Sequence, residues 1–192
     1  DNSSSINISS DIAPSVVYAM CPLGHDFTWS GNGKMSGTMN LWKSMNGTLT
    51  VNKDLDYTGT TVISEGTMAI NGKLAGRLDL RAKGTLAGNP ILNDTILFEG
   101  ALNYEGCRLS PGTSDAPYGV ITSNKSRTLP GKVFIEENLQ TEGTVRCDLL
   151  KVNGDLTLQG INTFTMIPAE IKSNAGEYVL AECTGTISAD SS

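Results

Sequence analysis

Short runs of alternating apolar and polar residues recur along the chain from Thr28 onward, and a glycine begins each run. The shared pattern is Gly-Thr followed by apolar, polar and apolar residues, or a close variant of it. Five copies are found at 37–41, 47–51, 66–70, 143–147 and 154–158, with partial copies at 76–80 and 131–135. A period of two places the third and fifth residues on one face of a β-strand. We therefore predict a short, half-buried strand at each run, with a turn at its glycine.

An all-β fold follows, because no stretch has the 3.6-residue periodicity of an amphipathic helix. A parallel β-solenoid stacks equivalent strands of successive coils and so repeats one motif. A β-sandwich joins antiparallel strands by two-residue turns, for which Asn71-Gly72 and Asn153-Gly154 are suitable. The recurring motif, spaced about ten residues apart in places, favours the solenoid, and the β-sandwich is kept as the alternative.

The domain organisation has two parts. Residues 1–26 open with a Ser/Asn-rich stretch and are interpreted as an N-terminal tail and cap. Residues 27–192 form the repeating domain. Within it, the pattern is interrupted at 110–131, where we predict an insertion loop.

Composition narrows the function classes. The chain has 192 residues, the size of one domain, and 21 of them are glycine, which is well above the usual share and indicates many tight turns. A formal net charge of −6 supplies no cationic field for nucleic acid. No run of about 18 apolar residues is present, so we predict no membrane insertion of this segment.

The four cysteines, Cys21, Cys107, Cys147 and Cys183, lie far apart in the sequence. They form no C-x-x-C pair of the kind that zinc sites and redox motifs use. We therefore predict neither a metal nor another cofactor. An even number of cysteines permits two disulfides in three pairings, and the sequence leaves open whether any form.

An ordered series of segments carries a resemblance to a known family: 27–33, 40–44, 47–51, 56–62, 63–72, 84–88 (taken as a turn), 109–112 and 152–158. Together they resemble the autotransporter-associated β-strand repeat over most of the chain after residue 26. The resemblance implies a right-handed, single-stranded parallel β-helix. It also implies a bacterial cell-surface or secreted protein, with the β-helix as a passenger stalk or as a module of a large polysaccharide-acting protein. It implies no catalytic residues.

Catalytic candidates are few. His25, the only histidine, is next to Asp26, but no G-x-S-x-G motif accompanies them to complete a catalytic triad. Glycoside hydrolysis requires two carboxyl groups that flank the scissile bond, and two pairs of acidic residues could supply them. They are Asp54 with Asp56 and Glu136 with Glu137. Solvated loop charges explain both pairs better, so we predict that the chain is not an enzyme.

Binding candidates come from aromatic rings and from the predicted loop. An exposed strip of Trp29, Trp42, Tyr57 and Tyr104 would let sugar rings stack, although packing within strands is the commoner use of such rings. The loop contributes three further candidates, because loops on rigid scaffolds often carry binding groups. The predicted ligand contacts are Trp29, Trp42, Tyr57, Tyr118, Lys125 and Arg127.

These observations predict a non-catalytic structural or display module of a larger secreted or outer-membrane-associated bacterial protein, for example an accessory domain of a polysaccharide-acting protein. Its partners would be other domains of that protein and a polysaccharide or host surface. One alternative is a carbohydrate-binding or adhesin-like module that contacts the host surface. The other alternative is a polysaccharide lyase or glycoside hydrolase built on a β-helix.

Overall fold

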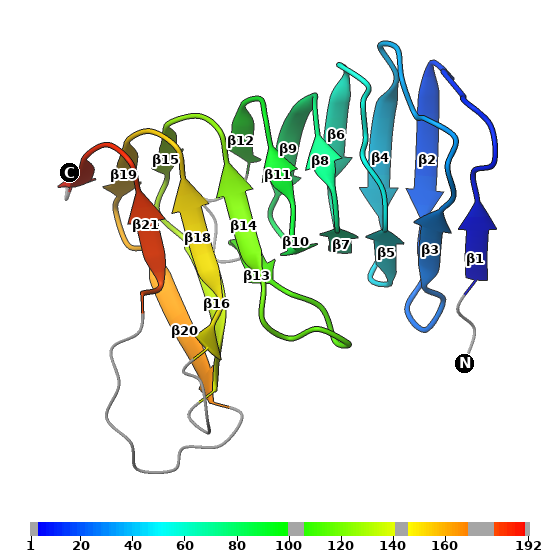
Figure 1. Cartoon of the computed structure of the whole chain (residues 1–192). Coiled ribbons are helices and arrows are strands. Elements are labelled where there is room, and N and C mark those ends of the chain that lie inside the picture. The colour runs from blue at the N-terminus through cyan, green and yellow to red at the C-terminus, as the bar shows by residue number, and fades with distance from the viewer. Residues whose placement is uncertain (1–3, 100–105, 141–145, 169–178, 191–192) are drawn as a thin grey trace.

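The computed structural model describes residues 4–99, 106–140, 146–168 and 179–190. These residues are organised as β-strands and connections, and no helix occurs among them. They include no helix that is long and apolar enough to cross a membrane. The all-β prediction is confirmed for this part of the chain, and the strands stack side by side into an elongated body with the two termini at opposite ends (Figure 1).

The strands belong to four sheets, which we call the first to the fourth sheet. The first sheet contains β1 (Ser4–Asn7), β3 (Phe27–Ser30), β5 (Thr48–Val51), β7 (Gly66–Ile70), β10 (Gly84–Gly88), β13 (Cys107–Pro111) and β16 (Val133–Gln140), with β17 (Arg146–Cys147) and β20 (Thr163–Pro168) paired to β16. The second contains β2 (Val16–Met20), β4 (Asn40–Ser44), β6 (Thr60–Ile63), β9 (Arg77–Arg81) and β12 (Ile96–Glu99). The third contains β8 (Lys73–Leu74), β11 (Ile91–Leu92), β14 (Val120–Ser123), β18 (Leu149–Val152) and β21 (Ala181–Cys183). The fourth contains β15 (Arg127–Leu129), β19 (Leu156–Gln159) and β22 (Ile187–Asp190).

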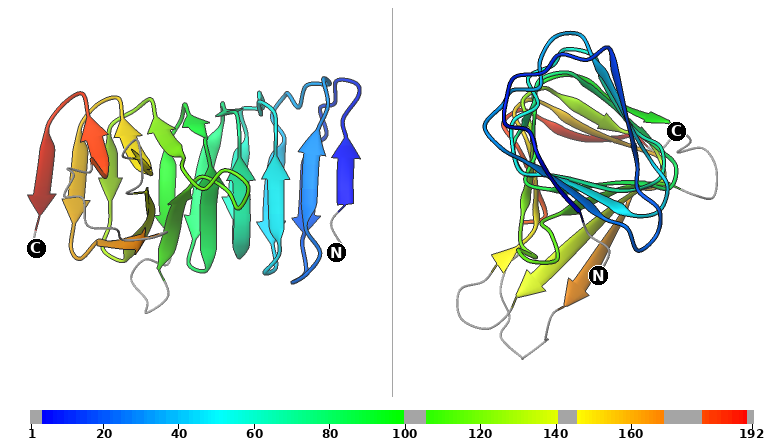
Figure 2. Two further views of the ribbon diagram at one scale, coloured as in Figure 1. Left: turned by 60° about the horizontal axis from the view of Figure 1, so that its bottom comes forward. Right: turned by 90° about the vertical axis from the view of Figure 1, so that its right-hand side faces the viewer.

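The chain passes from sheet to sheet and returns to each sheet one strand further along the body. We call one such passage a coil. Viewed along the body, the sheets form the sides of a roughly triangular outline (Figure 2). This arrangement fits a β-solenoid.

The β-sandwich alternative is wrong. Every described strand pair is parallel except β16 with β17, whereas hairpins would make neighbouring strands antiparallel. Asn71-Gly72, considered above as a hairpin turn, joins β7 of the first sheet to β8 of the third. The glycine there marks a corner between two sheets.

The inward-facing residues of stacked strands form columns. In the first sheet, parallel pairing places the residues of one column directly above one another: Leu49, Met68, Leu86, Leu109 and Ile135. All of them are buried. The prediction that the third and fifth residues share a buried face is confirmed at 47–51, 66–70, 76–80 and 131–135. Stacked aliphatic side chains therefore fill the interior along the body.

Several predicted boundaries need correction. The segment 84–88, predicted as a turn, is strand β10, which pairs in register with β7. Within 1–26, β1 pairs with β3 and β2 pairs with β4, so 4–20 form a coil of the stack and are not a tail. The predicted insertion loop at 110–131 contains β14 and β15, both paired in parallel, and 112–119 is the longest stretch without a strand within it. Local patterning missed these strands because their glycine-led alternation is incomplete or absent, whereas pairing with other coils identifies them.

Asparagine side chains connect successive coils at the corners. Asn71 Nδ2 donates to Asn52 Oδ1 at 2.8 Å, and Asn71 Oδ1 accepts from the Asn89 backbone N–H at 3.2 Å. A second ladder at another corner links Asn153 to Asn124 (2.8 Å) and Asn124 to Asn93 (2.7 Å). These bonds satisfy polar groups at the turns and hold neighbouring coils in register.

A buried lysine lies on the inward face of β4. Lys43 is fully buried, in register with Ile63 of the next coil. Its Nζ donates to the backbone oxygens of Met45 (2.8 Å) and Glu65 (2.9 Å). Burial lowers the pKa of Lys43. At the same corner Gly66 has φ +70° and approaches the backbone of Met45 so closely that a Cβ would clash, so this position requires glycine.

Candidate functional site

The three residues of the predicted aromatic strip that the structure describes are buried or half-buried. Trp29 is only 6% exposed and Tyr57 is fully buried, and both belong to the core. The Tyr57 hydroxyl is hydrogen-bonded to Thr61 Oγ1. Trp42 is half-buried, with the Arg81 guanidinium 5.1 Å from its ring centroid. Packing explains these three rings, and Tyr104 lies outside the described residues.

The three candidates at 110–131 have separate environments. Tyr118 is half-buried in the 112–119 loop. Lys125 is exposed and forms an ion pair with Asp94 at 2.7 Å, which lowers the pKa of that carboxyl. Arg127 is buried, its Nη2 donates to the Asp94 backbone oxygen, and burial lowers its pKa. Lys125 and Arg127 therefore fix the corner at Asp94, away from Tyr118.

The acidic candidates have structural partners. Asp26 Oδ1 accepts a hydrogen bond from the Thr48 backbone N–H at 2.6 Å, and Asp54 Oδ1 accepts one from Lys73 N–H at 2.8 Å. Glu136 pairs with Arg108. The side chain of Glu137 is outside the described residues, and His25 is exposed.

The cysteines are free thiols, and the described residues contain no group of three His, Cys, Asp or Glu side chains arranged to hold a metal ion. Cys107 is buried, and its Sγ donates to the Leu80 backbone oxygen at 3.1 Å. Register places Cys183 opposite Val152, whereas Cys147 precedes β18. Cys147 and Cys183 therefore lie at different ends of the β18–β21 pair.

A groove of about 500 Å³ lies on the outer face of the first sheet. We call it the sheet groove. Its floor crosses β5, β7, β10, β13 and β16, so it runs along the stack and across the strands. This volume falls in the range of known ligand sites, about 300 to 1,000 Å³.

Two parallel rows of side chains, all small except Arg108, form the floor of the sheet groove. Register aligns the first row as Thr48, Thr67, Thr85 and Arg108. It aligns the second row as Thr50, Ala69, Ala87 and Ser110. Both rows are outward-facing positions of the strands whose alternate residues form the buried columns.

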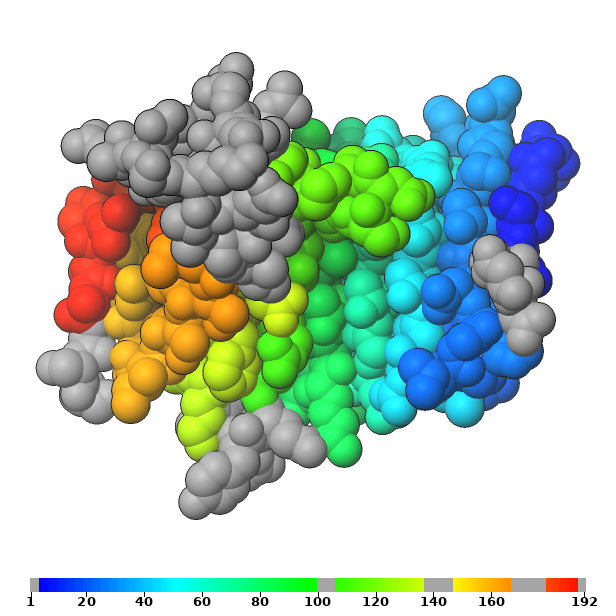
Figure 3. Space-filling model, turned by 90° about the horizontal axis from the view of Figure 1, so that it is seen from below, coloured from blue at the N-terminus to red at the C-terminus, as the bar shows by residue number. Residues whose placement is uncertain are grey.

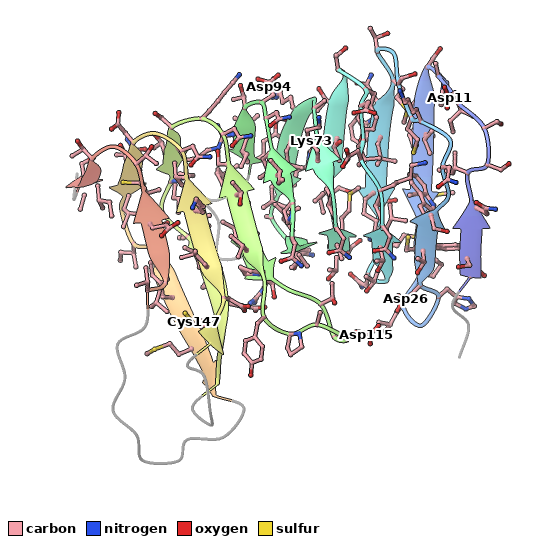
Figure 4. All side chains as sticks on the ribbon, viewed as in Figure 1. Asp11, Asp26, Lys73, Asp94, Asp115 and Cys147 are labelled. Carbon is pink, nitrogen blue, oxygen red and sulfur yellow. The ribbon has the colours of Figure 1, made fainter. Side chains whose placement is uncertain are left out.

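The loop 112–119 forms the wall of the sheet groove. It folds back from β13 toward the N-terminal coils, as the ribbon and the space-filling view both show (Figure 3). Paired backbone hydrogen bonds between Gly112 and Gly88, at 2.7 and 2.8 Å, fix its start, and Asp148 Oδ1 accepts from Gly119 N–H at 2.7 Å to fix its end. Asp115 near the loop tip lies on the same side of the stack as Asp26 and opposite Asp94 (Figure 4).

An ion pair closes one end of the sheet groove. Arg108 Nη1 lies 2.7 Å from Glu136 Oε1, and the guanidinium is 5.2 Å from the centroid of the Phe134 ring. The two charges compensate each other. The groove thus offers threonine and serine hydroxyl groups along a floor with no net charge.

Sequence reasoning missed this site although part of its signal was present. In most of the glycine-led runs a threonine follows the glycine. Period-two alternation already places this threonine on the outer face of the strand. Stacking of Thr48, Thr67 and Thr85 depends on a register that links residues 17 to 24 positions apart in this half of the chain. The loop wall cannot be derived from alternation at all.

Comparison with known proteins assigns no family: no protein-family model, curated protein or solved structure shows a significant match. The functional argument therefore depends on geometry and chemistry.

Proposed function

We propose that the chain is a non-catalytic structural module that acts as a stiff spacer or display element in a larger secreted or cell-surface bacterial protein. In finer detail, we propose a right-handed, single-stranded parallel β-helix of the autotransporter-associated repeat type. One observation carries the proposal: a parallel ladder continues through the first sheet from β1 to β16 and on to β20.

Physical reasoning connects this ladder to stiffness. A single coil cannot bury its apolar face, so each coil depends on its neighbours. The buried columns and the two asparagine ladders tie neighbouring coils together along the whole stack. With strands about 4.8 Å apart, the eight strands from β1 to β20 span about 34 Å.

Stiffness can be measured by single-molecule fluorescence transfer between dyes placed site-specifically at Ser9 and Ser188, near opposite ends of the stack. A rigid module gives one narrow distance that stays constant with added urea until cooperative unfolding. A broad distance distribution that widens gradually with urea would contradict the proposal. An experimental structure then tests the handedness.

Absence of catalysis is tested separately by incubating the chain with a polysaccharide panel. We expect no reducing ends and no unsaturated products. Product release that disappears in Glu136→Gln would support the glycosidase or lyase alternative and overturn the non-catalytic assignment. Glu136 is chosen because its carboxylate lines the sheet groove.

A further inference from the structure

We propose that the sheet groove binds an uncharged oligosaccharide chain, which lies along the stack and across β5, β7, β10 and β13. This inference goes beyond the spacer function and does not depend on it. It rests on the repeat distance, the chemistry of the floor and the charge balance of the groove.

The repeat distance favours a chain molecule with short, regular units. Parallel strands present equivalent side chains every 4.8 Å or so, which is close to the length of one pyranose unit in an extended glycan. Successive hydroxyls of Thr48, Thr67 and Thr85 would therefore meet successive sugars. The floor from β5 to β16 spans about 19 Å, which is room for about four units.

The floor chemistry fits sugars. A threonine hydroxyl both donates and accepts hydrogen bonds, as sugar hydroxyls do. In the described part of the chain, the hydroxyls of Thr50, Thr67 and Thr85 make no hydrogen bond to protein, so they are available to a ligand. Ala69 and Ala87 are buried, with 3% and 6% of their surface exposed, so their short side chains leave space above the floor and contribute almost no contact surface.

Charge selects an uncharged glycan over an acidic one. Arg108 is the cation of the groove lining, and Glu136 compensates it at 2.7 Å. The chain as a whole carries a formal charge of −6, which repels polyanions. Acidic polysaccharides are therefore disfavoured both at the site and at long range.

Isothermal titration calorimetry with β-1,4-glucan, xylan and mannan and β-1,3-glucan oligosaccharides tests this proposal. We expect saturable binding of at least one series. Affinity should rise from the disaccharide to the tetrasaccharide and then level off at the hexasaccharide. Binding should also vary little with salt, because no net charge is neutralised.

The double variant Thr67→Val with Thr85→Val replaces two groove hydroxyls by methyl groups of similar size. Each lost hydrogen bond should weaken binding about two- to tenfold, and the pair about four- to hundredfold. Thr28→Val is the matched control, because Thr28 stacks in register with Thr50 but lies on β3, outside the groove lining. Unfolding curves of all variants verify that they are folded.

A second variant tests the wall by replacing 113–118 with two glycines. Glycan affinity should fall about tenfold, whereas thermal unfolding should change little because loop length has a small effect on stability.

Three results would overturn the proposal: no binding by any neutral glycan of the panel, unchanged affinity in the double threonine variant, or salt-sensitive binding confined to acidic glycans. None of these results bears on the stiffness measurement, so the two proposals fail separately.

Discussion

The coils formed by residues 4–99 are shorter than those formed by 106–190, although both groups stack on the same first sheet. Side-chain hydrogen bonds between neighbouring coils join residues 18 to 23 positions apart in the first region. They join residues 27 to 33 positions apart where the second region stacks. Some of the added residues lie between strands, as in 112–119, and others lengthen β16, which has 8 residues where β5, β7 and β10 have 4 or 5. The paired strands keep their register.

The difference in coil length shows that the stack requires a continuous buried column and tolerates extra residues elsewhere in the coil. The column from Leu49 to Ile135 crosses the boundary between the two regions without interruption. This buried column thus continues through both regions, although the second sheet ends at β12 and the fourth sheet begins at β15. The sequence added at 112–119 stays outside the column. This addition is the loop that walls the sheet groove.

The largest expected effect tests whether the two regions share one core. Leu86 and Ile135 are both fully buried in the same column, one in each region. Leu86→Ala and Ile135→Ala should each lower the free energy of unfolding by about 2 to 5 kcal/mol, as measured by urea titration. A loss in only one region would show that the longer coils are packed differently.

A smaller effect on the free energy of unfolding depends on pH. It tests the boundary between the two regions, where Cys107 begins β13. Burial, with a contribution from Glu99, raises the pKa of this thiol to about 11. The unfolded chain loses the thiol proton first, so stability falls as pH rises from about 9 to 11, by up to about 2 to 3 kcal/mol. Cys107→Ala should flatten this fall, which is followed by urea midpoints across the pH range.

Ile121→Val is the control for that experiment, since it alters the core without altering a thiol. Its urea midpoints should lie below those of the original chain by the same amount at every pH. Cys21 and Tyr57, whose pKa values burial also raises, leave a residual slope in all variants. If the curve of Cys107→Ala runs parallel to that of the original chain, the assignment to Cys107 is wrong.

The smallest effect compares the asparagine ladders. Asn71→Ala in the first region and Asn124→Ala in the second each remove two hydrogen bonds between coils. Each should cost about 1 kcal/mol of unfolding free energy, because a corner bond depends on register and not on coil length. Asn46→Ala is the exposed control, expected to be nearly neutral. A much larger loss at Asn124 would mean that long coils rely more heavily on their corners.

The strands were largely predictable because alternation is a local property of the sequence. The residues Leu49 and Val51 reveal their buried face without any knowledge of their neighbours. The coil length was not predictable in this way, since glycines 37 and 47 precede strands of different sheets. Their ten-residue spacing is the distance from one sheet to the next within a coil. Stacked strands are separated by the length of a whole coil, which this spacing does not give.

The candidate site was less predictable. The inward positions of Trp29 and Tyr57 agree with alternation about Phe27 and Leu55, so their burial could have been foreseen. The pairing of Arg108 with Glu136 could not, because the two residues lie in different coils, 28 positions apart. The buried Lys43 shows the same limit, since its carbonyl partner at Glu65 is supplied by the next coil.

The register that aligns Asn52, Asn71 and Asn89 makes successive coils interchangeable. Val51 and Ile70 end equivalent strands, and each is followed by an asparagine at the same corner. Joining Val51 directly to Asn71 would therefore excise one coil and leave the flanking ones matched, and copying the same segment would add one. A closed globular core fixes the number of its elements. In this stack, recombination between repeats can change the length of the molecule by one coil at a time.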